Sequence, residues 1–303
     1  MLQRAGYACL DQLGRNEQAA RTGDAEGIHQ MRVAVRRWRA TLNGDGVSKT
    51  AHSELILDQF TRQALAFSTA AMITDDKVLA RIVECAGAQP VDTVLDVACG
   101  PGLVVCAFAP HVRSATGIDF TPTMLDRARV VAAGKGIRNV AWDQGDAYHL
   151  PYADGGFSIV VTRYSLHHLL DPQAALREMV RVCAPGGRIV VVDAYAPEDP
   201  VQAAAYHRVE TLRDPSHARA LSLTELRELF PRAGLSKPEV TLYELPVELQ
   251  ELLARAFPNP GDEAELAEIF TAPDAAGRLG IPVYREAGKV HIAYQAAILV
   301  ADV

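Results

Sequence analysis

Three acidic residues in the first half of the chain are placed where they could hold a small polar ligand. Asp96, Asp119 and Asp146 each lie at or near the end of a short apolar run. A carboxylate can pair with a cationic group, or it can accept hydrogen bonds from sugar hydroxyls. If the three runs are neighbouring strands, the acids would share one binding site.

The apolar runs 93–97, 115–120 and 139–144 are typical of buried parallel strands. The first leads through Gly100-Pro101-Gly102 into an expected helix at 103–109. A strand, a glycine turn and a helix form a crevice at the carboxyl edge of a doubly wound sheet. Glycines in that turn let a ligand approach the backbone closely. The pattern therefore predicts an α/β fold with the acids along one edge.

The first two acids each allow a more specific interpretation. Asp96 would be costly to bury unless it is paired, so it either caps the turn, forms a salt bridge or binds a cationic ligand. Asp119 fits the recognition of ribose hydroxyls by the acid that ends the second strand. The turn is not G-x-G-x-x-G, so a dinucleotide is not the first choice of ligand.

From about Asp58 to its C-terminus, the chain resembles the class I S-adenosylmethionine-dependent methyltransferases. The motifs that carry the resemblance are D-V-A-C-G-P-G at 96–102, G-I-D-F-T-P-T-M-L at 117–125, G-D-A at 145–147 and R-V-C-A-P-G-G-R at 181–188. Within this class it is similar to the small-molecule group that includes the ubiquinone and menaquinone methyltransferases. The resemblance implies a seven-stranded Rossmann-like sheet with an antiparallel last strand. It also implies S-adenosyl-L-methionine as cofactor and a small-molecule acceptor.

The resemblance and the strand-end argument together predict a set of cofactor-binding residues. They are Phe67, Asp96, Ala98, Gly100, Gly102, Asp119, Phe120, Met124, Asp146, Ala147 and Arg163. In similar enzymes an aromatic residue near Phe67 covers the methionine part of the cofactor, and Met124 could lie over the adenine ring. For both residues, ordinary core packing is the competing interpretation. Arg163 would help to fix the cofactor or an acidic substrate.

A histidine pair follows the fourth expected strand, at 157–162. It belongs to Arg163-Tyr164-Ser165-Leu166-His167-His168, which should border the crevice. Histidine titrates near neutral pH, so it can remove a proton from an acceptor. Adjacent residues do not point the same way, so at most one histidine is the base, and the other should bond to a backbone carbonyl. We expect Tyr164 and His168 to contact the substrate.

Residues 1–46 lie outside the methyltransferase pattern and are expected to form a helical extension. The segment 29–37 resembles the opening helix of CHAD domains, which are helical bundles associated with polyphosphate. A basic helix can bind polyanions, but the remainder of that bundle is missing. Two functions therefore compete with methyl transfer: binding of polyphosphate or another polyanion, and a subunit that binds the cofactor but is catalytically silent.

The methyltransferase domain is expected to span 52–303, with a lid insertion near 195–222 that would select the substrate. The insertion contains a polar helix and then the segment 213–219. A simpler interpretation pairs Arg213 with a nearby acid and makes Asp214 a helix cap. Further on, we expect a strand near 238–245 and a helix near 246–257.

Composition limits the remaining possibilities. The chain has 303 residues, a formal net charge of −7 and five cysteines. The acidic balance argues against a nucleic-acid partner. No run approaches the ~20 apolar residues of a membrane span, and no apolar signal-peptide region is evident. The odd number of cysteines favours free thiols in the cytoplasm. No metal-ligand spacing is present, and a monomer and a homodimer both remain open.

Overall fold

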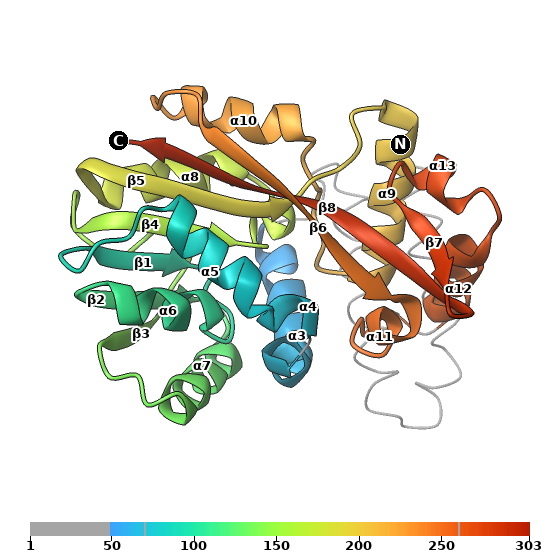
Figure 1. Ribbon diagram of the computed structural model, residues 1–303, viewed down its shortest axis with the longest axis horizontal. Coiled ribbons are helices and arrows are strands. Elements are labelled where there is room, and N and C mark those ends of the chain that lie inside the picture. Colours follow the sequence, from blue (N-terminus) through green and yellow to red (C-terminus); the bar gives the residue numbers. More distant parts are fainter. Residues whose placement is uncertain (1–48, 70, 260) are drawn as a thin grey trace.

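A single mixed sheet lies at the centre of the fold (Figure 1). The computed structural model describes residues 49–69, 71–259 and 261–303, so the predicted extension at 1–46 lies outside the described residues. The strands are β1 (Thr93–Val97), β2 (Ser114–Asp119), β3 (Val140–Gln144), β4 (Phe157–Arg163), β5 (Cys183–Ala194), β6 (Glu239–Glu248), β7 (Val283–Glu286) and β8 (Lys289–Asp302). Their order is β3-β2-β1-β4-β5-β8-β6, and β7 pairs with β8.

The strand directions agree with the expected α/β class. Strands β1 to β5 are parallel to one another, whereas β8 is antiparallel to both β5 and β6. The antiparallel last strand is thus confirmed. The described sheet has eight strands where seven were expected, because the four-residue β7 forms a hairpin with the start of β8. The chain changes direction across the sheet between β1 and β4, and a ligand crevice is expected at such a switch point.

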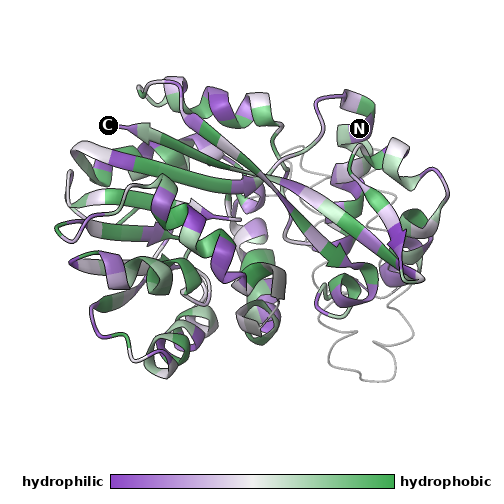
Figure 2. Ribbon diagram, in the orientation of Figure 1, coloured by the Kyte–Doolittle hydropathy of each residue, from purple (hydrophilic) through white to green (hydrophobic). Residues whose placement is uncertain are grey.

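Helices cover both faces of the sheet. The described α-helices are α3 (Lys49–Thr69), α4 (Ala71–Thr74), α5 (Asp76–Cys85), α6 (Leu103–Phe108), α7 (Pro122–Gly134), α8 (Pro172–Val182), α9 (Pro200–Arg213), α10 (Leu223–Arg232), α11 (Leu249–Leu253), α12 (Asp262–Thr271) and α13 (Ala275–Leu279). Helices α8 and α10 bury apolar side chains on one face, and α5, α6 and α7 do so on the other. Figure 2 shows the mainly hydrophobic central strands between them.

Local sequence signals explain where two of these helices begin. Asp171 accepts a hydrogen bond from the Ala174 backbone N–H at 2.9 Å, and Pro172 occupies the first position of α8. Ser222 and Glu225 form a reciprocal capping box at the start of α10. Both helices therefore begin at fixed positions beside the sheet, and their apolar stripes face it.

Strands β6 and β8 extend beyond the main sheet and carry a second lobe, on the right in Figure 1. On one edge, the segment 296–302 of β8 pairs with β5; β6 pairs with 291–300 of β8, and β7 pairs with 289–292. Helices α9, α11, α12 and α13 pack on this outer part around a separate apolar core. Only α9 comes from the predicted insertion at 195–222. The insertion is therefore one part of a larger lobe that also uses 245–292.

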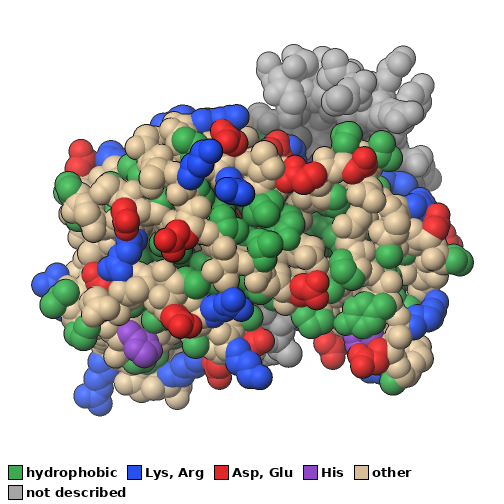
Figure 3. All heavy atoms as spheres, turned by 45° about the horizontal axis from the view of Figure 1, so that its top comes forward, with side chains coloured by type: hydrophobic (Ala, Val, Ile, Leu, Met, Phe, Trp, Pro, Cys, Tyr) green, Lys and Arg blue, Asp and Glu red, His purple; other side chains and the backbone are tan. Residues whose placement is uncertain are grey.

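The surface view shows basic and acidic side chains interspersed on one face of the described part (Figure 3). Among the residues that the structure describes, none of the helices has the length and apolar character needed to cross a membrane. The four described cysteines, Cys85, Cys99, Cys106 and Cys183, are free thiols.

Candidate functional site

A cavity opens at the carboxyl ends of β1, β2, β3 and β4, and α3 forms part of its wall. Most of the predicted site residues line it: Phe67, Asp96, Ala98, Gly100, Asp119, Phe120, Met124, Asp146, Ala147, Arg163, Tyr164 and His168. Their elements are separated in sequence, but the parallel strands bring their carboxyl ends to one edge of the sheet. We call this the main cavity.

Gly102 is the predicted residue that does not line the main cavity. It has a φ of +76°, and a Cβ built on it would lie 2.4 Å from Cη2 of Trp142 and 2.9 Å from the Cβ of Ala128. The absence of a side chain therefore serves packing of the turn against β3 and α7. Gly100 differs, because a Cβ on it would meet no atom within 4 Å.

Substituting Gly102→Ala should lower the free energy of unfolding by about 2–4 kcal/mol, because the new Cβ collides with Trp142 at an unfavourable φ. Denaturant unfolding of the full-length protein measures the loss. Gly100→Ala is the matched control, since φ there is +52° but the space is open; it should lose only about 1 kcal/mol. Equal losses at both positions would contradict the packing role.

Two opposite charges in the main cavity are buried and only partly satisfied. Asp96 is 1% exposed, and among the described residues neither of its carboxylate oxygens has a hydrogen-bond partner. Arg163 is 8% exposed; its Nη1 donates to the Ile73 carbonyl at 2.9 Å, but Nε and Nη2 have no partner. Burial and the nearby Asp119 raise the pKa of Asp96 well above its usual range, against the opposing influence of Arg163. The cavity can thus receive a group that bears both an ammonium and a carboxylate.

Asp119 holds the glycine turn and the start of α7 in place. Its Oδ2 accepts from the Gly100 N–H at 2.8 Å, and its Oδ1 accepts from the Thr121 N–H at 2.8 Å. Burial raises the pKa of Asp119 despite these two hydrogen bonds. Each oxygen keeps a second acceptor position, so the residue can still accept from ligand hydroxyls. Asp119 therefore has a structural task that the sequence did not reveal.

The backbone is strained where β1 and β4 end. Ala98 has a φ of 56° and Tyr164 a φ of 53°, a region that residues with a Cβ rarely adopt. The Arg163 guanidinium lies 4.5 Å from the centroid of the Tyr164 ring. The Tyr164 hydroxyl lies 2.7 Å from the hydroxyl of Tyr243 in β6. Such strain concentrates at functional sites. Tyr164 thus holds Arg163 in place at the cavity wall, and its hydroxyl is already engaged.

The far end of the main cavity is lined by the loops after β2 and β3. Asp146 Oδ1 accepts from the Tyr148 N–H at 2.9 Å, which shapes the loop beside Ala147. Phe120 is 38% exposed, whereas Met124 is 1% exposed and packs in the interior while lining the cavity. Core packing of Met124 is thus observed, and its contact with an adenine ring stays a prediction.

Helix α3 closes one side of the main cavity. Phe67 lines the cavity and meets Phe60 edge-on at 5.8 Å between centroids. The His52 Nε2 lies 2.6 Å from the His168 carbonyl oxygen. Gln63 donates to Asp214 Oδ2 at 3.2 Å. These contacts link α3 to both the sheet edge and the second lobe; sequence reasoning had selected Phe67 alone from this helix as a site residue.

The two adjacent histidines have different environments. His168 is buried, and its Nδ1 lies 3.2 Å from the Ser216 carbonyl oxygen. Burial and the charge of His167 lower the pKa of His168 far below its ordinary value. His167 instead places Nδ1 2.6 Å from Oδ1 of the buried Asp193. His168, predicted to be the catalytic histidine, therefore has the carbonyl contact expected of the structural one.

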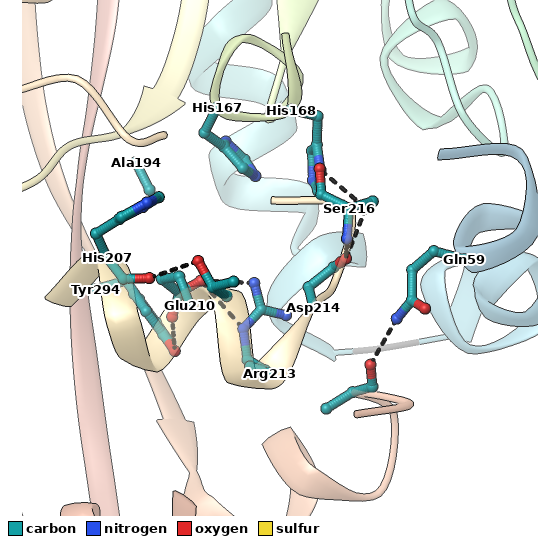
Figure 4. A network of polar contacts seen from close by, with 12 residues as sticks. Gln59, His167, His168, Ala194, His207, Glu210, Arg213, Asp214, Ser216 and Tyr294 are labelled. Carbon is teal, nitrogen blue, oxygen red and sulfur yellow. Dashed lines mark hydrogen bonds and ion pairs between the residues drawn. The ribbon is translucent and has the colours of Figure 1, made fainter. Parts of the chain in front are cut away.

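A second cavity adjoins the first beneath α9, and the two share Phe67, Ile73, Tyr164 and His168 in their walls. Its polar wall comes from the second lobe and the turn after β4 (Figure 4). The ionisable residues in this wall, besides His168 and the tyrosines, are His167, Glu210, Arg213, Asp214, His217 and Arg255. We call this the second cavity.

The charges around the second cavity are paired. Glu210 accepts from Arg213 Nη2 at 2.6 Å and from the Tyr294 hydroxyl at 2.9 Å. Asp214 Oδ1 accepts from the Ser216 hydroxyl at 2.6 Å. The simpler interpretation of Arg213, an ion pair with a nearby acid, is thus confirmed. In the described part of the chain, no group of three or more His, Cys, Asp and Glu side chains could hold a metal ion.

A doubly wound sheet with buried carboxylates at its switch point belongs to the α/β proteins that bind a ligand at the carboxyl edge. A protein-family model described as a methyltransferase domain matches residues 95–191. The Bacillus subtilis uncharacterized methyltransferase YcgJ is 36% identical over 192 residues, which cover 61% of this chain and 76% of that protein. The chain therefore belongs to the methyltransferase-domain family.

Other comparisons agree with this assignment. A demethylmenaquinone methyltransferase of Mycolicibacterium vanbaalenii is 35% identical over 59% of this chain and 66% of its own length. The crystal structure of B. subtilis YcgJ superposes with a TM-score of 0.68 at 30% identity and covers 75% of this chain and 97% of that one. A geranyl diphosphate methyltransferase in complex with SAM shares the fold, with a TM-score of 0.56 at 17% identity, over 75% of this chain and 85% of that one.

A second family model, the CHAD domain, matches residues 4–71. This match reaches further than the resemblance at 29–37 and runs through α3. The described part of the match packs against α7 and lines the main cavity. In this chain, the end of the CHAD-like segment is therefore part of the wall of the main cavity.

Proposed function

We propose that the protein is an S-adenosyl-L-methionine-dependent methyltransferase that transfers a methyl group to a small-molecule acceptor by in-line displacement. The observation that carries the proposal is the pair of unsatisfied charges in the main cavity. Asp96 and Arg163 are both buried and close enough to influence each other, but they form no ion pair, and four of their polar atoms have no partner in the described ranges. A zwitterionic amino-acid group would satisfy both at once, and the cofactor carries such a group.

The remaining cavity residues fit the other parts of this cofactor. Asp119 would accept hydrogen bonds from the ribose hydroxyls, because its two backbone hydrogen bonds do not use all of its acceptor positions. Gly100 leaves open space above the turn, so a ligand can approach its backbone. Asp146 and Ala147 would contact the adenine amino group, with Phe120 and Met124 along the ring. The proposed methyltransferase domain, from about 52 onward, thus includes α3.

The bound cofactor supplies a methyl group that its sulfonium already makes electrophilic. The protein's own contribution is to orient the reactants and exclude water. Phe67, Ile73 and Tyr164 stand between the main and second cavities, where an acceptor would face the cofactor. Holding two reactants in a near-attack arrangement can contribute ~7–11 kcal/mol to lowering the barrier.

Two other functions give different expectations. A polyanion-binding protein would need its site in the CHAD-like segment and has no use for buried carboxylates beside a glycine turn. A catalytically silent subunit would bind the cofactor without turnover. Homologues named as methyltransferases and the adjoining second cavity favour an active enzyme. Free thiols at the four described cysteines favour a reducing compartment such as the cytoplasm.

Calorimetric titration of the full-length protein with S-adenosylmethionine and S-adenosylhomocysteine tests the proposal. We expect one site per chain with micromolar affinity for both. Absence of binding by either would overturn it. A parallel titration with polyphosphate tests the polyanion-binding function. That function predicts binding of polyphosphate and no binding of S-adenosylmethionine or S-adenosylhomocysteine.

A further inference from the structure

The second cavity has the character of a site for an uncharged molecule. Its charged wall groups already have partners: Arg213 with Glu210, Asp214 with Ser216, and Arg255 with a partner of its own. An ionic ligand would have to compete with these pairs. Within the described residues, His217 has no hydrogen bond on either ring nitrogen, and burial lowers its pKa, which keeps it uncharged. Phe67 and Tyr164, together with Tyr206, Tyr294 and aliphatic side chains of the second lobe, supply an apolar wall.

Among the described residues of this wall, His167 and His168 each have a fixed orientation and an Nε2 atom without a hydrogen bond, but His167 is oriented by a carboxylate and His168 by a backbone carbonyl. The Asp193 carboxylate receives its Nδ1–H at 2.6 Å and its backbone N–H at 3.3 Å. With the proton on Nδ1, the neutral ring carries its lone pair on Nε2. Within the part of the chain that the structure describes, no hydrogen bond engages Nε2, and the ring lines the second cavity but not the main one.

The surrounding charges make His167 more basic than the neighbouring histidines His168 and His217. Its ionisable neighbours are His168, Asp193, Glu210, Arg213 and His217, with the His168 and His217 ring centroids 4.3 and 5.5 Å away. Burial would lower the pKa of His167, but the charge and hydrogen bond of Asp193 outweigh it and raise that pKa above 6.5. Burial and the charge of His167 both lower the pKa of His217.

We propose that the second cavity binds the methyl acceptor, an uncharged aromatic molecule with an ionisable hydroxyl, and that His167 Nε2 takes the hydroxyl proton. Asp193 acts as a positioning residue. This inference rests on the proposed function. The acceptor O–H bond breaks, and its proton goes to Nε2. The oxygen lone pair forms the new bond to the methyl carbon while the carbon–sulfur pair leaves with the sulfur. His167 then returns its proton to solvent.

The first test measures proton transfer without turnover. The probe is 4-nitrophenol, whose phenolate absorbs visible light, added to full-length protein saturated with S-adenosylhomocysteine. Binding should increase the phenolate fraction at fixed pH. His167→Asn keeps a hydrogen-bond donor for Asp193 but has no basic nitrogen. The increase in phenolate fraction should therefore be at least about tenfold smaller in this variant. His207→Gln is the matched control: its ring lies 5.2 Å from His217 in the same cluster but outside the cavity lining, and the signal should persist.

The second test separates positioning from packing. The methylation rate should rise with pH through a midpoint above 6.5, because Nε2 accepts a proton only when neutral. Asp193→Asn removes the negative partner, so the midpoint should move to lower pH. A lost rate with an unmoved midpoint would contradict the role of Asp193.

The failures are distinguishable. If His167→Asn folds, binds S-adenosylhomocysteine and still ionises the phenol like the parent, the inference about His167 is overturned and the proposed function stands. If the parent neither binds 4-nitrophenol nor increases its ionisation, the acceptor class is wrong. If no variant binds S-adenosylhomocysteine, the proposed function itself fails. Should His167→Asn fail to fold, His167→Gln replaces it.

Discussion

Substituting Asp96→Asn should make the ligand-free protein more stable and weaken S-adenosylmethionine binding. The Asp96 carboxylate is 1% exposed and has no hydrogen-bond partner, so burying its charge opposes folding. Removing that charge should raise the free energy of unfolding by about 1–2 kcal/mol at neutral pH. The same change removes the negative charge that we propose faces the cofactor ammonium and leaves only a neutral amide oxygen as acceptor. Affinity should fall about 10- to 100-fold, because hydrogen bonds to charged groups contribute about 1.5–3 kcal/mol.

The gain in stability should depend on pH. Burial raises the pKa of Asp96 in the folded protein above its ordinary 3.8. Below pH 3.8 the carboxyl is protonated in both the folded and the unfolded state, so parent and variant should differ little in stability. As pH rises from 3.8 through the raised folded pKa, the unfolded state loses its proton first and the parent loses stability. Denaturant unfolding at about pH 4 and pH 7, with calorimetry at pH 7, measures both effects.

Asp92 is the matched control, four residues earlier and just before the same strand. Its carboxylate accepts from Arg188 Nη2 at 2.9 Å and from the Ser158 hydroxyl at 2.8 Å. Although burial acts against it, these contacts lower the pKa of Asp92. Asp92→Asn should therefore destabilise the protein and leave cofactor affinity unchanged. If Asp96→Asn destabilises as well, or binds the cofactor like the parent, the assignment of Asp96 fails.

The sequence located the main cavity because its signals are local. Asp96, Asp119 and Asp146 each end a recognisable apolar run, and parallel strands place such ends together. It could not show what each side chain contacts. Gly102 looked like part of the cofactor turn, but its neighbour is Trp142, 40 residues further along. That Arg163 lies near Asp96 without pairing to it is likewise a property of the fold.

The second lobe was harder to predict because it depends on long-range strand pairing. We expected a helix at 246–257, but β6 continues to Glu248 and only α11 follows. Pro246 pairs with Ala293 in an edge strand, where the missing N–H of proline is tolerated. The pairing of β6 with β8 brings 245–292 against α9. Nothing in the local pattern of either segment indicates that contact.

The roles of the two histidines show the same limit. The sequence indicated that at most one of the two histidines is the base and that the other bonds to a backbone carbonyl, and we expected His168 to contact the substrate. The two are separated by their partners, Ser216 and Asp193, which come from different parts of the chain. A buried carboxylate orients a histidine and makes it more basic, whereas a backbone carbonyl only orients it.

Substituting Glu210→Gln should strongly destabilise the second lobe. Glu210 is 4% exposed and binds Arg213 through one oxygen and Tyr294 through the other. Without the negative charge, Arg213 keeps its own charge in a buried wall that also contains Arg255. Removing one partner of a buried ion pair typically costs about 3–5 kcal/mol. Denaturant unfolding of the full-length protein should show a loss of this size.

Two further variants identify the uncompensated charge as the cause. Tyr294→Phe keeps the ion pair and removes one hydrogen bond, so it should lose only about 1–2 kcal/mol. The double variant Glu210→Gln/Arg213→Met removes both charges and should recover most of the stability lost in Glu210→Gln. If the double variant were no more stable than Glu210→Gln, the loss would come from packing around Glu210. The second cavity would then depend on the shape of that side chain and not on its charge.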